Sequence, residues 1–196
     1  AWKLALVVLG EAAPALLDSY SPERRGATLD VFANAKKSTR FMTPPTRGWK
    51  LARDAALSLA LTHDFTRSLA NPRQMQPYTY ADSPLTLHAA RDQDFTGGPV
   101  CGSAAPNPVL PDGSHLLDHA GLGRTAIVFG ADELSDAQSA ALNALKACDT
   151  RLAVVMVGGD ASRSAIIADR DGRIHDAFAA PPGSLYVLRP DLHVAG

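Results

Sequence analysis

Few side chains in this sequence have the types and spacing that metal binding requires. His115 and His119 could bind a metal ion from one face of a helix, but Asp118, the nearest third ligand, would lie on another face. Asp169-Arg-Asp-Gly172 matches the first half of a calcium loop without its later oxygen ligands, and Asp-Gly is first of all a turn signal. We therefore expect no metal-binding residues.

The sequence gives no more support to nucleophilic catalysis than to metal binding. Ser184 lacks the nucleophile-elbow pattern, and no Ser/His/Asp set occurs at a recognised spacing. Ser135 begins a predicted helix, and its Ser-x-x-Gln spacing to Gln138 predicts a capping box. Gly158-Gly-Asp160 follows a predicted strand, where open α/β sheets bind ligands, but a tight turn is the simpler interpretation. We assign no catalytic and no cofactor-binding residue to this chain.

The composition of the chain limits the kinds of partner that it is expected to bind. The chain has 196 residues with 19 basic and 20 acidic side chains, so no attraction of the whole chain to nucleic acid or membrane is expected. Arg24 to Arg53 is basic but has few aromatic residues for base stacking, which favours a solvated helix face or ion pairs to another domain. Cys101 and Cys148 are predicted to be free thiols in a reducing cytoplasm. No apolar run is long enough to span a bilayer.

The elements that would position any site lie in the last third of the chain. The apolar runs Thr125–Gly130 and Leu152–Val157 predict buried parallel strands on either side of the helix that starts at Ser135. A short helix is predicted from Gly172 to Ala179. Ser184–Arg189 predicts a third strand, and His193-Val194 a fourth, antiparallel one.

This β-α-β-α-β-β order resembles the thioredoxin fold without its final helix, and Pro182 stands where that fold keeps a cis proline. A redox-active member needs two cysteines at the start of the first helix, where the helix dipole lowers the thiol pKa. Gly130–Ser135 contains no cysteine. Disulfide exchange is therefore excluded, and a structural module is predicted.

The rest of the chain predicts helices and a linker. Ser21 and Pro22 have the types expected of an N-cap and a first helical residue. Asn71 to Asp112 is rich in Pro, Gly, Asp and Ala without periodicity, which predicts an extended linker. The predicted helices are about 1–9, 15–20, 21–41 and 47–61. The predicted domains are a helical segment (1–70), a linker (71–114) and an α/β domain (115–196).

Several segments carry a family resemblance. Ala1–Leu6, Leu16–Tyr20 and Ser21–Arg25 resemble the block that follows the second FAD-binding motif in flavin-dependent aromatic hydroxylases. The similarity is to the phenol hydroxylase and 3-(3-hydroxyphenyl)propionate hydroxylase type. Tyr80–Pro84 resembles their connecting segment, and Pro182–Asp191 resembles the end of their C-terminal thioredoxin-like domain.

The resemblance implies a cytoplasmic parent enzyme that uses FAD and NAD(P)H to hydroxylate a phenolic ring. The Gly-x-Gly-x-x-Gly turn that holds the FAD pyrophosphate does not occur in this sequence, and neither does the family's Gly-Asp-Ala-Ala-His motif. The chain is therefore expected to be an inactive structural and dimerisation module. Its expected partners are a preceding FAD domain and further copies of the same protein.

Two alternatives stay open. One is a stand-alone, redox-inactive thioredoxin-like module that binds a small molecule above Gly158-Gly159. The other is an enzyme of the thiol-peroxidase kind, for which Ser135 is the only candidate at the start of the first helix.

Overall fold

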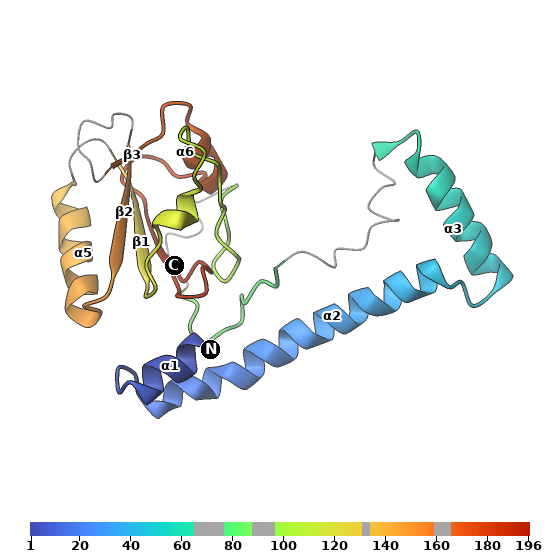
Figure 1. The fold of residues 1–196 in the computed structure, drawn as a ribbon, viewed down its shortest axis with the longest axis horizontal. Helices are drawn as coiled ribbons and strands as arrows, with labels where there is room; N and C mark the ends of the chain where they lie inside the picture. The colour runs from blue at the N-terminus through green and yellow to red at the C-terminus, as the bar shows by residue number, and fades with distance from the viewer. Residues whose placement is uncertain (65–76, 88–96, 131–133, 159–165) are drawn as a thin grey trace. The chain divides into compact units, whose positions relative to one another are not determined.

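The computed structural model describes residues 1–64, 77–87, 97–130, 134–158 and 166–196 (Figure 1). The chain divides into two compact units, one that joins Ala1–Ser19 to Thr79–Gly196 and one that comprises Tyr20–Tyr78. These limits differ from the three predicted segments. The first 19 residues group with the C-terminal part of the chain and not with the helices that follow them.

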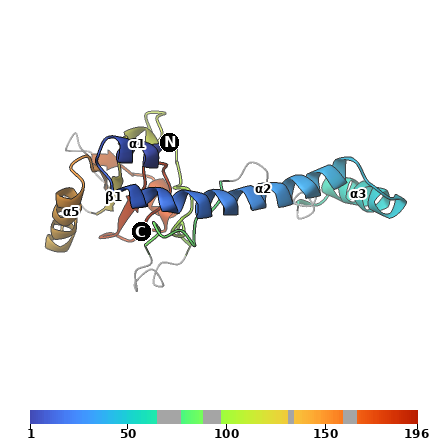
Figure 2. The same cartoon turned by 90° about the horizontal axis from the view of Figure 1, so that it is seen from below.

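The described residues of the unit Tyr20–Tyr78 form two helices. α2 (Tyr20–Met42) is a single uninterrupted helix (Figure 2), and α3 (Arg47–Ala60) follows after Pro44-Pro45. The hydroxyl of Thr46 caps α3 by accepting a hydrogen bond from the backbone N–H of Trp49.

The prediction that Ser21 caps a helix is wrong. Ser21 lies inside α2, because the 3-10 helix η1 (Pro14–Ser19) leads directly into it. An N-cap residue has a non-helical backbone, and the chain is already helical at this point.

A four-stranded mixed sheet organises the other unit. Its order is β3-β2-β1-β4, with β1, β2 and β3 parallel and β4 antiparallel to β1. Helix α5 (Asp136–Cys148) connects β1 to β2. The strands are β1 (Thr125–Phe129), β2 (Ala153–Gly158), β3 (Ile166–Ala168) and β4 (Leu185–Leu188).

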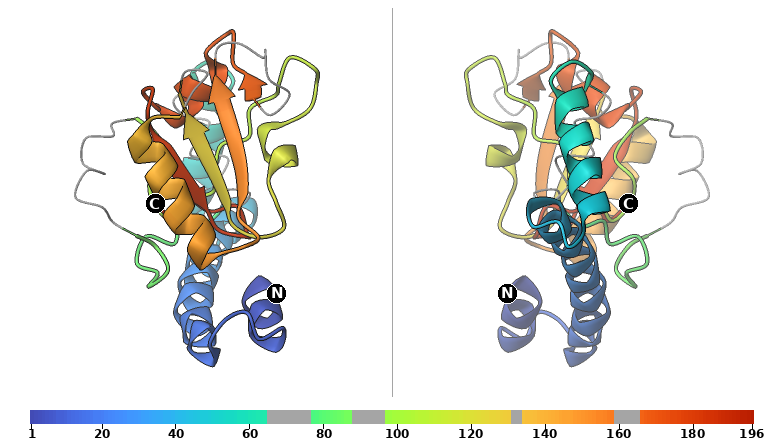
Figure 3. Two further views of the ribbon diagram at one scale, coloured as in Figure 1. Left: turned by 90° about the vertical axis from the view of Figure 1, so that its left-hand side faces the viewer. Right: turned by 90° about the vertical axis from the view of Figure 1, so that its right-hand side faces the viewer.

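Helices cover both faces of this sheet. α5 lies on one face, and α6 (Arg173–Phe178) and η4 (Leu116–His119) lie on the other (Figures 1 and 3). The side chains of β1 alternate between the faces. Ala126 and Val128 pack with Leu142 of α5, whereas Ile127 and Phe129 point into the larger cluster beneath α6. This arrangement explains why β1 is apolar throughout and buried at all five positions.

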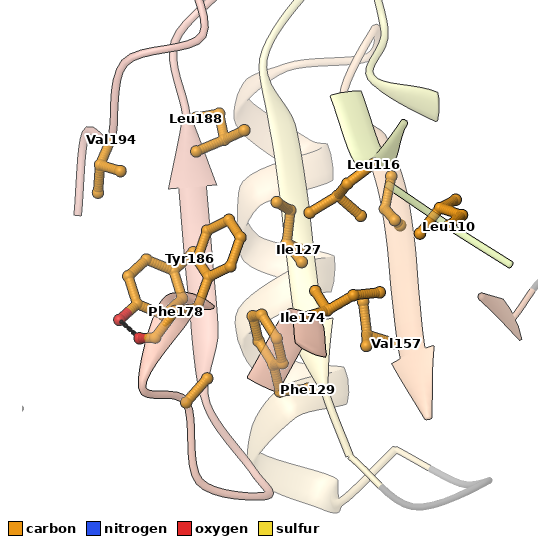
Figure 4. Close-up of a cluster of buried hydrophobic side chains, with 12 residues drawn as sticks. Leu110, Leu116, Ile127, Phe129, Val157, Ile174, Phe178, Tyr186, Leu188 and Val194 are labelled. Carbon is orange, nitrogen blue, oxygen red and sulfur yellow. Dashed lines mark hydrogen bonds between the residues drawn. The ribbon is translucent and has the colours of Figure 1, made fainter. Parts of the chain in front are cut away.

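The larger cluster centres on three aromatic rings, Phe129, Phe178 and Tyr186 (Figure 4). Their centroids are 5.2–5.9 Å apart in tilted or edge-to-face pairs. The hydroxyl of Tyr186 is satisfied inside the cluster, because it donates a 2.8 Å hydrogen bond to the carbonyl oxygen of Phe178.

The C-terminal residues continue the sheet beyond β4. Val194 forms an isolated antiparallel bridge with Leu188, so the predicted fourth strand is reduced to a bridge. Val194 also exchanges backbone hydrogen bonds with Gly102 and Ser103, and the Ala195 carbonyl accepts one from Leu87. Residues 79–87 and 97–114 of the predicted linker thus belong to the same unit as the sheet.

Gly102 has to be glycine for this packing. Its φ is +87°, and a Cβ atom there would lie 2.5 Å from the carbonyl carbon and oxygen of Tyr80. The described residues contain no cis peptide bond, and Pro182 is therefore trans. No helix in the described ranges combines the length and the hydropathy that crossing a bilayer would require.

Candidate functional site

Ser135 caps α5 as predicted. Its hydroxyl accepts a hydrogen bond from the backbone N–H of Gln138, and the Gln138 side chain accepts one from the backbone N–H of Ser135. A dinucleotide pyrophosphate would need these helix-terminal amides. Two backbone amides at the start of α5 are thus already engaged, and the described residues contain no Gly-x-Gly-x-x-Gly sequence.

The remaining predicted candidates lie apart from one another. Asp118 accepts a 2.8 Å hydrogen bond from the backbone N–H of His115 at the start of η4, so its carboxylate stabilises a helical turn. Within the described ranges, no three His, Cys, Asp or Glu side chains form a group that could hold a metal ion. Cys101 and Cys148 are not joined in a disulfide bond. Gly159 and Asp160 lie outside the described residues.

Asp169 stabilises the turn into α6. Its buried carboxylate accepts hydrogen bonds from the backbone N–H groups of Ile174 and His175 and lies 2.7 Å from His175 Nδ1. Burial alone would raise the pKa of Asp169, but these hydrogen bonds outweigh it and lower the pKa. Gly172 adopts a left-handed conformation here, so the turn interpretation of Asp169–Gly172 is correct.

One buried polar group among the described residues was not singled out by the sequence analysis. We call it the Arg189 cluster; it comprises Trp2, Tyr80, Arg189, Asp191 and His193. The Arg189 guanidinium, whose side chain is only 4% exposed, makes a bidentate ion pair with Asp191 at 2.7 and 3.0 Å. It also lies near the Trp2 ring, 5.4 Å from its centroid, and near the Tyr80 ring, at 5.2 Å.

Trp2 and His193 complete this cluster. The Trp2 indole donates a 2.9 Å hydrogen bond to Asp191 Oδ2 across 189 positions of sequence. His193 Nδ1 lies 3.0 Å from the Asp191 carbonyl oxygen and therefore carries a proton. The His193 ring also contacts the Tyr80 ring at a centroid distance of 4.8 Å. The cluster thus joins three distant parts of the chain, around residues 2, 80 and 191.

The electrostatics of the cluster favour its charged state. Burial alone would raise the pKa of Asp191, but hydrogen bonds from His193, Arg189 and Trp2 outweigh it and hold the pKa well below its usual range. For His193, burial lowers the pKa, but the hydrogen bond and the negative charge of Asp191 outweigh this effect and raise the pKa above its ordinary value.

The raised pKa predicts a pH-dependent stability. Because folding raises the His193 pKa, its contribution is fully present below the unfolded-state pKa and is lost as pH rises through the folded-state pKa. Each unit by which the pKa is raised corresponds to about 1.4 kcal/mol. We expect urea denaturation to give a lower free energy of unfolding at pH 9 than at pH 6, and His193→Gln to reduce this difference. An unchanged pH dependence in the variant would contradict the assignment.

A hollow of about 620 Å³ lies beside the cluster. One wall comes from α1 (Trp2–Val8) and the residues after it, and the other comes from α5, β4 and residues 84–87. Glu11 and Arg151 form an ion pair between residues that line the two walls. The lining arginines Arg124, Arg151 and Arg189 each have a carboxylate partner, so the hollow shows no unpaired charge that would select a ligand.

Comparison with known proteins gives this architecture a context. Residues 108–196 match the family model of the HcaD C-terminal domain. The whole chain is 28% identical to a 3-(3-hydroxy-phenyl)propionate/3-hydroxycinnamic acid hydroxylase of Escherichia coli strain K12 / DH10B, and 29% identical to that of Escherichia coli O157:H7. The chain is similar to the C-terminal part of flavin-dependent aromatic hydroxylases. The resemblance predicted from the sequence is thereby confirmed.

Solved structures of longer chains contain a similar fold. The aklavinone-11 hydroxylase complex with FAD and aklavinone is 24% identical, with a TM-score of 0.67 over 100% of this chain and 34% of its own. The RebC-10x structure, native and K252c-bound, is 26% identical with a TM-score of 0.66. The chain spans 36% of the length of the curated relatives above.

Proposed function

We propose that this chain is the C-terminal part of a cytoplasmic, FAD-dependent and NAD(P)H-using monooxygenase that hydroxylates a phenolic substrate. The observation that carries the proposal is the match of 100% of the chain to 36% of the 3-(3-hydroxy-phenyl)propionate/3-hydroxycinnamic acid hydroxylases. Within that enzyme, we propose, the chain serves as a structural and dimerisation module.

The proposed module is a thioredoxin-like domain. The order β2-β1-β4 followed by the bridge to Val194, with α5 as the crossover, supports this assignment. β3 is an additional short strand at the far edge of β2. Ser135 is engaged in capping, so no observation favours the alternative of a thiol-peroxidase-like enzyme.

The exposed apolar surface of the helices in Tyr20–Tyr78 supports an FAD-binding part as the partner that covers them. Glu23 is the only buried residue among those described in this unit, so the two helices lack an apolar core of their own. Large exposed apolar surfaces mark interaction sites. The relatives extend well beyond the matched 36%, which supplies enough chain to cover these helices. The exposed apolar side chains are Leu29, Val31, Phe32, Met42, Trp49, Leu51, Leu57, Leu59 and Leu61.

The uncovered helices predict self-association of the 196-residue chain in isolation. We expect light scattering to give a mass well above 20.6 kDa. Leu51→Glu together with Leu59→Glu should lower that mass, because both side chains are exposed on α3. Glutamate at the exposed Leu122 and Val109, in the other unit, is the matched control. A strictly monomeric parent chain would contradict the prediction.

The proposed reaction is tested with the protein purified from its native host. We expect oxidation of NADH or NADPH that is stimulated by 3-(3-hydroxyphenyl)propionate or a related phenol, with a product heavier by one oxygen atom. The 196-residue chain, mixed with FAD, should bind none. A native protein without phenol-stimulated oxidation would contradict the proposed enzyme, and flavin binding by the isolated chain would contradict the structural role.

A further inference from the structure

The hollow of about 620 Å³ beside the Arg189 cluster has the size of a small-molecule site. Ligand pockets in proteins usually enclose about 300–1,000 Å³ and are lined mainly by apolar side chains with a few polar groups. The described residues that line the hollow all belong to the unit of residues 1–19 and 79–196, so one compact part of the molecule forms it. Apolar side chains line both walls, among them Leu6, Leu16, Leu85, Leu87, Leu145 and Val187.

The two walls of the hollow are bridged at two points. At the start of α1, the Trp2 indole donates a 2.9 Å hydrogen bond to Asp191 Oδ2. After the end of α1, Glu11 forms an ion pair with Arg151 on the opposite wall. A helix with its side chains is roughly 10–12 Å wide, so a helix laid between the walls would have to break one of these contacts. A small molecule would leave both contacts in place.

Apolar surface remains uncovered between the two bridges. Leu6 belongs to one wall, Leu145 and Val187 belong to the other, and all three residues are only half-buried. The wall that carries Leu6 is held by its own backbone, because the N–H groups of Glu11 and Ala12 both donate to the Leu6 carbonyl oxygen at 2.8 and 3.1 Å. Covering these side chains with an apolar molecule would remove their surface from water, which is favourable.

The charges around the hollow disfavour an ionic ligand. Each of the three arginines in its lining has a carboxylate partner, so positive and negative charges balance. The pairs are Arg124–Asp149, Arg151–Glu11 and Arg189–Asp191. An anion would have to displace a carboxylate from a guanidinium, and a cation would have to displace a guanidinium from a carboxylate. A neutral molecule leaves all three pairs intact.

We propose that the hollow binds a neutral, mainly apolar small molecule, held between Leu6 on one wall and Leu145 and Val187 on the other. The ligand occupies the space between the two bridging contacts. This inference rests on the lining of the hollow and not on the proposed monooxygenase activity, so the two can fail separately.

Cys148 reports on the occupancy of the hollow. Cys148 is exposed and lines the hollow, whereas Cys101 is half-buried elsewhere in the unit. The test uses the natively expressed protein, the neutral apolar probe N-phenyl-1-naphthylamine, and iodoacetamide to alkylate the thiols. Mass spectrometry of the peptides gives the rate at each cysteine. At a probe concentration of about ten times its Kd, we expect alkylation of Cys148 to slow roughly tenfold and that of Cys101 to stay unchanged.

Two variants locate the bound probe. Leu145→Trp fills the hollow from α5 and should abolish the protection of Cys148. Val109→Trp is the matched control, since Val109 is 51% exposed in the same unit and does not line the hollow. Leu87→Asp, at a position that is 65% exposed, places a charge in the hollow without loading the core and should weaken the protection.

Three results would overturn the proposal. The first is alkylation of Cys148 at the same rate with and without the probe. The second is protection that both Leu145→Trp and Leu87→Asp leave unchanged, because the probe would then bind elsewhere. The third is a Cys148 thiol that does not react in the native protein even without the probe, because protein would then cover the hollow.

Discussion

Phe129→Ala is expected to destabilise the unit of residues 1–19 and 79–196 by about 3–5 kcal/mol. Phe129 is fully buried at the end of β1, in ring contact with Phe178, Tyr186 and His175. Its removal leaves a cavity at the centre of the larger cluster, and the surrounding rings are held by β4 and α6. Urea denaturation followed by circular dichroism gives the change in the free energy of unfolding.

The control for this variant is Leu122→Ala. Leu122 is fully exposed in the same unit, so its truncation should change the free energy of unfolding by less than about 0.5 kcal/mol. A loss below about 1 kcal/mol for Phe129→Ala would mean that the aromatic cluster is not the core of this unit.

Deletion of His193–Gly196 is expected to prevent this unit from folding. The four residues take part in six backbone hydrogen bonds, with residues 87, 102, 103, 187 and 189, and Val194 is fully buried. Each hydrogen bond contributes about 1 kcal/mol net, and burial of Val194 roughly 2 kcal/mol. The sum is comparable with the whole stability of a small domain, about 5–15 kcal/mol.

Circular dichroism and near-ultraviolet spectra of the truncated chain measure this effect. The point variant Val194→Ala keeps the backbone bonds and should cost only the burial contribution. Val109→Ala is its matched control, since Val109 is 51% exposed in the same unit. If the truncated chain still unfolded cooperatively, and at the same urea concentration as the full 196-residue chain, the role given to the C-terminal residues would be contradicted.

The sheet was predictable where its sequence signals are local. The apolar run at 125–130 contains β1, and the run at 152–157 contains all of β2 except its last residue, Gly158. Ser135 with Gln138 marks the start of α5. β3 escaped prediction because three residues, Ile166–Ala168, are too few to show a period. Ser21 has the residue type of an N-cap, but the preceding η1 overrides that local preference.

The Arg189 cluster could not be predicted because its contacts are not local. Trp2 and Asp191 are far apart in sequence, and an Arg-Pro-Asp segment by itself indicates only a turn. The packing of Gly102 and Leu87 against the C-terminal residues could not be predicted for the same reason. A segment rich in Pro and Gly looks like a linker when its hydrogen-bond partners are about a hundred residues away.

The most direct test of the central claim is the intact mass and the flavin absorbance of the protein as natively expressed. If the chain is the C-terminal part of a flavin-dependent hydroxylase, the native protein is yellow, and its mass is well above the 20.6 kDa of these 196 residues. A colourless native protein of about 20.6 kDa would contradict this account and would leave binding or assembly as the function of the chain.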